Sequence, residues 1–480
     1  MSFRTLLFPA LACLLFSLAG AAQDAAPSLA ELADGTRSAA AALQRMIEES
    51  DGLVDLPAGT FLLDAPLVLD LPRLGWRSLR GADGATRLVV AHAGPGILVQ
   101  GDHQGTANPA TVQDHTWEKE RFPSVSGVEI LGAHPEADGI VLSRTMKCVI
   151  RGVLVRKCRH GIRLVERNRN TLIADAHIYD CLDTGVLLDA CDLHQVNLTG
   201  SHISYNGRAG VRQFNGDVHN VQISGNDIEY NAGAEGGLPA GEIVLEAPEG
   251  IISEYSITGN TLQARPQNPG ANLLVLGAEN NTPHAARTMT VSGNVIGDRD
   301  KNIVLSRACR VTVTGNTVYG GAALNIHLDR CANIVLSGNN IGSRPFSHAE
   351  ADPHVDGVLV EECDSVLLSG NILSGHRFGT PERGGAVTLV NARTCRVTGC
   401  QILHPRVRGV HLLGGAGCVV SDNTITAPDG GEDFLAAVEL SGDGKNHLVQ
   451  NNALSDAPDP VLLADPAQGT VKDNTLLPAP

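Results

Sequence analysis

Three side chains in two short segments could carry out acid–base chemistry. His327 and Asp329 alternate along ALNIHLD, and Glu361 ends the later segment GVLVE. If both segments are neighbouring strands, alternation places all three side chains on one face, about 5 Å apart at the backbone. Carboxylates that close share a proton, hold a cation such as Ca²⁺, or act as acid and nucleophile, and a histidine beside them can remove a proton. We therefore expect catalysis at His327, Asp329 and Glu361, while the sequence leaves the need for a metal open.

Further polar side chains share this expected face. Four of them are candidates for binding a substrate: Arg163, Arg212, Asn325 and His411. Three acidic residues near Arg212 form a rival catalytic location, at least about 14 Å from the first: Asp189, Glu242 and Glu246.

Inserted segments precede the strands of this face. They cover residues 231–241, 343–356, 376–384 and 428–436, and could form one wall of a groove. The insertion 343–356 could also fold over the catalytic candidates, and it carries His348, Glu350, Asp352 and His354.

A local basic stripe contrasts with the acidic chain. From Arg144 to Arg169 there are nine Lys or Arg residues and one acid, whereas the whole chain carries −16. The overall charge argues against a general nucleic-acid or membrane-surface binder, which needs a basic surface. The stripe suits a polyanion such as a uronate chain, and the alternative is a solvated face whose charges pair with one another.

The elements that must position these residues are repeated. The pattern apolar-x-apolar-[S/T]-G-N-x-apolar recurs, as in VQISGNDI, VTVTGNTV and VLLSGNIL, and its copies are about 22 residues apart or more. Each copy is followed by a second strand pattern of the type DGIVL. Such alternation, with turns too short for helices, predicts an all-β, right-handed parallel β-helix of about 13 coils, in which the asparagines stack along one bend.

The start of the chain has two expected features. Residues 1–22 combine Arg4 with an apolar stretch and small residues, which is typical of a cleaved secretion signal, so we expect a secreted or periplasmic protein. We expect a capping helix and first strand in residues 23–65, followed by the β-helix domain in 66–480. This N-terminal stretch resembles the opening of the pectate-lyase-like β-helix superfamily, and the matching positions are Asp34, Gly35, Leu43, Gln44, Ile47, Leu56, Pro57, Ala58, Gly59, Thr60 and Phe61.

The resemblance implies a secreted protein of this fold but does not define a reaction, because the superfamily includes lyases, hydrolases, epimerases and phage tailspikes. The motifs of polygalacturonases and pectate lyases are absent. The residues Asp352, Pro353 and His354 are similar to the DPH of mannuronan epimerases, but they precede the strand rather than lie on it, which favours a repeat turn. We expect a polysaccharide lyase acting on a uronate-containing glycan by β-elimination. A glycoside hydrolase and a non-catalytic glycan-binding or structural protein are the alternatives, and the oligomeric state stays open.

Cysteines recur within the repeat. Ten remain after the expected signal is removed, and Cys309, Cys331 and Cys363 lie seven or eight residues before a ladder asparagine. Side chains at one place in successive coils stack on each other, so we expect a buried cysteine ladder, with disulfide bonds left open.

Overall fold

The computed structural model describes residues 28–106, 108–231, 239–265, 268–279, 285–343, 357–376, 379–427, 433–455 and 459–477. The expected secretion signal lies outside these ranges, as do His348, Glu350, Asp352 and His354. None of the helices in the described part of the chain has the length and apolar character that a membrane crossing requires.

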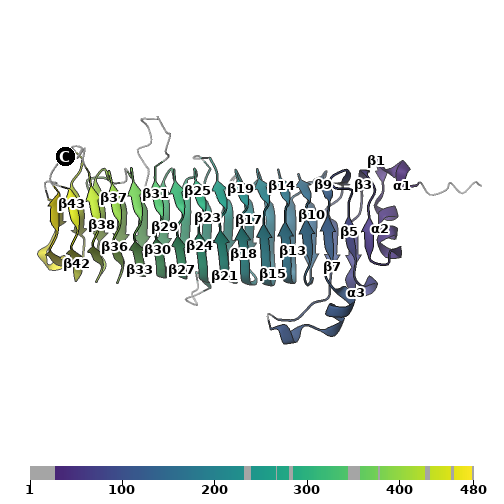
Figure 1. Ribbon diagram of the computed structural model, residues 1–480, viewed down its shortest axis with the longest axis horizontal. Coiled ribbons are helices and arrows are strands. Elements are labelled where there is room, and N and C mark those ends of the chain that lie inside the picture. Colours follow the sequence, from purple (N-terminus) through teal and green to yellow (C-terminus); the bar gives the residue numbers. More distant parts are fainter. Residues whose placement is uncertain are drawn as a thin grey trace, which may run out of the picture.

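The chain forms a parallel β-helix in which the strands, apart from those at the ends of each sheet, pair with strands of the coils before and after them (Figure 1). Each coil contributes up to three strands, and the equivalent strands stack into three parallel sheets. Sheet 1 contains β1 (Asp34–Ser38), β3 (Gly59–Leu63), β6 (Thr86–Val90), β9 (Val128–Gly132), β12 (Leu154–Arg156), β14 (His177–Tyr179), β16 (His202–Ser204), β19 (Asp227–Glu229), β22 (Thr261–Gln263), β25 (Val295–Gly297), β28 (Thr317–Tyr319), β31 (Asn340–Gly342), β34 (Ile372–Ser374), β37 (Gln401–Leu403), β40 (Thr424–Thr426), β43 (Ala453–Ser455) and β46 (Thr475–Leu477).

Sheet 2 carries the catalytic candidates on its outer face. It contains β4 (Leu67–Asp70), β7 (Gly94–Gln100), β10 (Ala137–Ser143), β13 (His160–Ala174), β15 (Thr184–Thr199), β17 (Ala209–Phe214), β20 (Gly241–Glu246), β23 (Ala271–Leu276), β26 (Lys301–Ser306), β29 (Leu324–Asp329), β32 (Val358–Glu361), β35 (Val387–Val390), β38 (Arg408–Leu413), β41 (Ala436–Ser441) and β44 (Val461–Leu463).

Sheet 3 follows sheet 2 in each coil, and the long strands β13 and β15 run through both sheets. Its other strands are β2 (Leu53–Asp55), β5 (Ser78–Arg80), β8 (Ser124–Ser126), β11 (Val149–Arg151), β18 (Asp217–Ser224), β21 (Ile251–Thr258), β24 (Ala286–Ser292), β27 (Ala308–Thr314), β30 (Ala332–Ser337), β33 (Asp364–Ser369), β36 (Arg396–Thr398), β39 (Val419–Ser421), β42 (His447–Gln450) and β45 (Gly469–Lys472).

The solenoid is longer than the repeat predicted. Sheet 1 has 17 strands within the described ranges, because β1, β3 and β6 precede the first recognisable copy of the pattern. These strands already pair with one another and β6 with β9, so the boundary expected at residue 66 is not a structural break. The helix α2 (Ala40–Glu49) buries Leu43 and Ile47 in the core, as a capping helix should. Figure 1 shows it at the N-terminal end of the stack, beside the short helix α1 (Leu29–Leu32).

The predicted asparagine ladder is confirmed at the bend between sheets 3 and 1. The side-chain oxygen of Asn316 accepts from both the backbone N–H and the side-chain amide of Asn294, at 3.0 and 2.9 Å. The same pattern continues along Asn226, Asn260, Asn294, Asn316, Asn339 and Asn371.

The residue before each asparagine has a positive φ, 63° at Gly315, which explains why Gly precedes Asn in so many copies of the repeat. In the coil that contains β14, Asp175 occupies this glycine position with φ 53°, and Ala176 occupies the ladder position. Asn and Asp tolerate this conformation better than most residues.

The cysteines are buried but do not all stack as expected. The backbone N–H of Cys331 donates to the sulfur of Cys363, so these two do lie at equivalent places. Cys309 instead lies opposite Ala332, the residue after Cys331, and so does not stack on Cys331. Within the described ranges, the ten cysteines form no disulfide bonds with one another.

Candidate functional site

The strands β29 and β32 bring the catalytic candidates together on the outer face of sheet 2. Ile326 and Leu328 point into the core, so His327 and Asp329 between and after them point outward. The strands pair in register with Asp329 opposite Glu361. His327 lies diagonally across from Glu361, within reach of its carboxylate.

Glu361 is the centre of the arrangement. His327 Nε2 lies 2.8 Å from Glu361 Oε2, and Arg383 donates from Nη2 to Glu361 Oε1 at 3.0 Å. The histidine and glutamate side chains remain 19% and 30% exposed, so a ligand can reach them. Because both carboxylate oxygens accept hydrogen bonds, Glu361 is suited to be an anion that orients His327 rather than a proton donor.

Asp329 has its own set of partners. It accepts from Ser306 Oγ at 2.7 Å and from Arg330 Nη2 at 2.7 Å. Burial opposes ionisation of this carboxyl, but the hydrogen bonds from Arg330 and Ser306 outweigh it and lower its pKa. Asp329 and Glu361 thus each hold an arginine, which supplies the positive charge that Ca²⁺ would otherwise provide, and this arrangement does not favour Ca²⁺ between them.

Arg383 was not among the residues singled out from the sequence, although the insertion 376–384 that carries it was. The loop that carries Arg383 is anchored by the buried Arg408. Arg408 donates to the carbonyls of Thr380, Pro381 and Gly384 at 2.8, 2.6 and 3.1 Å. The loop is therefore fixed on the face that also presents Glu361.

His411 also supports this loop, and the expectation that it faces a substrate is wrong because it is fully buried. Its Nδ1 accepts from the backbone N–H of Gly384 at 3.0 Å, and its Nε2 lies 2.7 Å from Ser441 Oγ. Burial, together with Arg408 and Arg383, lowers the pKa of His411 to about 4. The imidazole is therefore neutral near pH 7, as an acceptor for Gly384 must be.

Asn325 is likewise buried and does not line the outer face, contrary to the expectation. Its amide donates to the carbonyl of Gly342 at 3.1 Å, and its oxygen accepts from Asn302 at 2.7 Å. Asn325 therefore belongs to a second ladder, at the bend between sheets 1 and 2, and satisfies backbone groups there.

The expected substrate-binding arginines are occupied by acids. Arg163 forms ion pairs with Asp138 and Asp189, and Arg212 donates to Glu246 at 2.6 Å. Six of the nine basic residues in the stripe pair with acids in this way: Arg144, Arg151, Arg156, Arg159, Arg163 and Arg167. This arrangement favours the alternative of a solvated, internally paired face over a binding surface for polyanions.

The acidic residues of the rival location are held in ion pairs with arginines and do not form one open site. Glu242 is fully buried and pairs with the equally buried Arg299 at 2.8 Å. Burial raises the pKa of Glu242 to about 8, against the opposing effect of Arg299. Its carboxylate also accepts from Asn231, so Glu242 fills a bend of the solenoid rather than an open groove.

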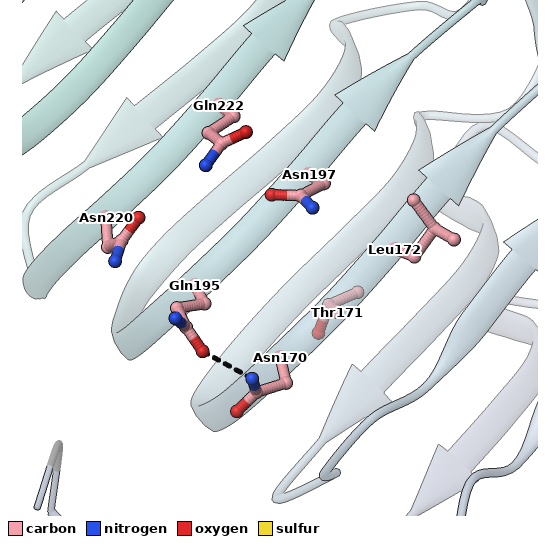
Figure 2. A pocket seen from close by; sticks show the side chains of 7 residues that line it. All are labelled: Asn170, Thr171, Leu172, Gln195, Asn197, Asn220 and Gln222. Atoms are coloured by element: carbon pink, nitrogen blue, oxygen red, sulfur yellow. Dashed lines mark hydrogen bonds between the residues drawn. The ribbon is translucent and has the colours of Figure 1, made fainter.

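A separate hollow lies on sheet 3, where β13, β15 and β18 run side by side (Figure 2). Its volume is about 230 Å³, and amide side chains predominate among its lining residues: Asn170, Thr171, Leu172, Gln195, Asn197, Asn220 and Gln222. Figure 2 shows the hydrogen bond from Asn170 to Gln195 along one edge. No signal in the sequence marks this hollow, because its residues are neutral and spread over three coils.

Comparisons with known proteins agree with the fold. A family model described as "Right handed beta helix region" matches residues 89–282, as the predicted fold requires. No curated protein matches the sequence.

Solved structures with a similar course of the chain include the A-module of mannuronan C-5 epimerase AlgE6 from Azotobacter vinelandii, with 13% identity, coverage of 93% of this chain and 97% of that one, and a TM-score of 0.42. A tailspike mutant of E. coli bacteriophage HK620, in complex with a hexasaccharide, has 14% identity, coverage of 91% and 76%, and a TM-score of 0.48. A PL6 alginate lyase in complex with a trisaccharide has 10% identity, coverage of 92% and 85%, and a TM-score of 0.47. The fold itself rests on the paired parallel strands, which form a parallel β-helix, and the family model over residues 89–282 is that of a right-handed one.

Proposed function

We propose that this protein is a secreted enzyme that cleaves a uronate-containing polysaccharide by β-elimination, with its active site at His327, Glu361 and Arg383. The observation that carries the proposal is the contact of 2.8 Å between His327 Nε2 and Glu361 Oε2 on an exposed sheet face. Secretion follows from the expected signal in residues 1–22.

The contact assigns roles to the two ring nitrogens. A hydrogen bond to the Glu361 carboxylate places the proton of the neutral imidazole on Nε2, and Nδ1 is then free to act as the base. In the reaction, Nδ1 would take the proton from the carbon next to the uronate carboxylate. The electrons of that C–H bond form the new C=C bond, the C–O bond to the leaving sugar breaks, and the leaving oxygen takes up a proton.

The uronate carboxylate needs a positive partner, because neutralising it makes the neighbouring C–H more acidic. Arg383 and Arg330 pair with Glu361 and Asp329, but their side chains remain 45% and 51% exposed, so they can also contact a substrate carboxylate. The base, its orienting group and two cations thus come from three adjacent segments of the chain.

Glycoside hydrolysis is the second candidate, because Asp329 and Glu361 are opposite each other in register. A hydrolase needs one carboxylic acid that gives a proton to the leaving oxygen. Both oxygens of Glu361 accept hydrogen bonds and the pKa of Asp329 is lowered, so neither carboxyl is well suited to be that acid.

A non-catalytic role in glycan binding is supported by the amide-lined hollow of sheet 3, since amides bind neutral sugar hydroxyls through paired hydrogen bonds. In that case Asn197→Ala should lose binding to a neutral glycan, measured by affinity electrophoresis, and no elimination product should form.

The test of the main proposal is a panel of uronate and neutral polysaccharides assayed in two ways. Elimination gives an unsaturated product that absorbs in the ultraviolet, whereas hydrolysis gives reducing ends without that absorbance. We expect absorbance with at least one uronate polymer. Reducing ends alone would favour the hydrolase, and neither product from any polymer would favour a binding protein.

A further inference from the structure

A polar cluster lies far from the proposed active site, in the arm between β7 and β8, which covers residues 101–123. The equivalent connection between β10 and β11 takes residues 144–148 only, so the arm is an inserted structure. It contains the short helices η1 (Pro109–Thr111) and η2 (Thr116–Glu120), and it lies beside the first coils below the stack in Figure 1. With eight strand spacings from β7 to β29, the cluster lies about 40 Å from His327 along the solenoid axis.

Asp102, His115 and Glu120 converge in this arm. Each offers one ligand atom, and the three atoms lie within 4.8 Å of one another. His115 Nε2 is 2.8 Å from Asp102 Oδ1, and the backbone N–H of Asp102 donates to Glu120 Oε1 at 3.0 Å. Ligand atoms about 2.1 Å from a tetrahedral ion are about 3.4 Å apart. Three ligand atoms within 4.8 Å of one another are therefore close enough to bind a single metal.

A second observation points to a missing ligand. Glu120 is only 1% exposed, yet its Oε2 has no hydrogen-bond partner. An unpartnered carboxylate oxygen in a buried place is costly. His103, which is buried beside Asp102, also has an unpartnered Nε2. His103 and Asp102 line a cavity of about 470 Å³ together with His115 and Thr116.

We propose that Asp102, His115 and Glu120 bind a divalent transition metal of the Zn²⁺ type, with His103 as a candidate fourth ligand or second-sphere partner. An imidazole nitrogen with two carboxylates favours such a metal over Ca²⁺, which prefers six to eight oxygens. Two ionised carboxylates and a neutral histidine carry a net charge of about −2, which one divalent ion balances.

The arrangement assigns this metal a structural role. The arm contacts the coils through Arg169, which donates to the carbonyl of Thr106 at 2.9 Å, and through Trp117, over whose ring Lys147 lies at 3.6 Å. Its ligands come from both ends of the arm, Asp102 next to β7 and Glu120 at the end of η2. A bound metal therefore joins these ends and holds the arm against the solenoid.

The test is calorimetric titration of ZnCl₂ into the full chain after treatment with a chelator. We expect about one tight equivalent for the unmodified protein, and its loss in His115→Ala and in Glu120→Gln. His177→Ala is the matched control, because His177 is an exposed histidine that stacks on His202 and could bind zinc adventitiously. Asp114→Asn controls for an exposed acid of the same arm.

Trypsin gives an independent measure, because Lys119 and Arg121 lie in the arm. Zinc should slow cleavage there in the unmodified protein and in His177→Ala, but not in His115→Ala. Since His115 is partly exposed, this variant should keep its circular dichroism spectrum. The proposal is overturned if no tight equivalent binds, if the loss occurs in His177→Ala instead, or if Ca²⁺ binds equally well and His115→Ala has no effect.

Discussion

At the scale of single residues, Glu361 decides between the candidate reactions, because it accepts hydrogen bonds from His327 and Arg383 at once. The alternation of residues along two strands was enough to predict that His327 and Glu361 meet. It could not predict that Asn325 and His411 are buried, because alternation gives the side of a strand but not whether a bend or loop covers it.

The substitution Glu361→Gln keeps the shape of the side chain but removes the anion that fixes the His327 tautomer. We expect kcat on the uronate substrate to fall by about 10²-fold or more, with little change in the unfolding midpoint. The exposed neighbour Glu362 provides the control Glu362→Gln, which should retain activity. Equal activity in both variants would remove Glu361 from the mechanism.

At the scale of elements, the sequence predicted the asparagine ladder best. In the repeat, the Gly adopts a positive φ and the Asn forms the hydrogen bonds of the ladder. Replacing Asn316 by Leu leaves the backbone N–H of Asn294 and the carbonyl of Val291 without their partner. We expect a loss of roughly 1 to 3 kcal/mol in the free energy of unfolding, measured by denaturant titration. Asn340 in β31 is exposed, so Asn340→Leu should cost much less, and an equal loss in the two variants would argue against the ladder as a source of stability.

The loop that presents Arg383 depends on the neutral state of His411. Its pKa is about 4 in the folded chain and about 6.5 when unfolded. The unfolded state therefore binds the proton more tightly, so the stabilisation is fully present above pH 6.5 and is lost as the pH falls towards 4.

The resulting prediction compares the unmodified chain with His411→Leu. The difference between their free energies of unfolding should shrink by about 2 to 3 kcal/mol between pH 7.5 and 4.5, measured by denaturant titration at each pH. The nearby groups Arg408, Arg383 and Glu439 are present in both proteins. A difference that does not depend on pH would show that His411 is not held neutral by the fold.

At the scale of the whole molecule, the repeat predicted the class of fold but undercounted its coils. β1, β3 and β6 lack the Gly-Asn turn, so only their pairing with later strands reveals them. The charge pattern was misleading for a similar reason. The basic stripe stands out in sequence, but its acidic partners, such as Asp138 and Asp189, come from neighbouring coils. Likewise, the pairing of Glu242 with Arg299 joins residues 57 positions apart, which local patterns do not encode.

The central claim is that the outer face of β29 and β32 performs β-elimination with His327 as the base. The most direct measurement is the ultraviolet absorbance of unsaturated product, followed over time for the unmodified protein and for His327→Ala on the best uronate polymer of the panel. We predict product from the unmodified protein and a rate lower by about 10² to 10⁴-fold in the folded variant. Unchanged product formation in His327→Ala would contradict this account.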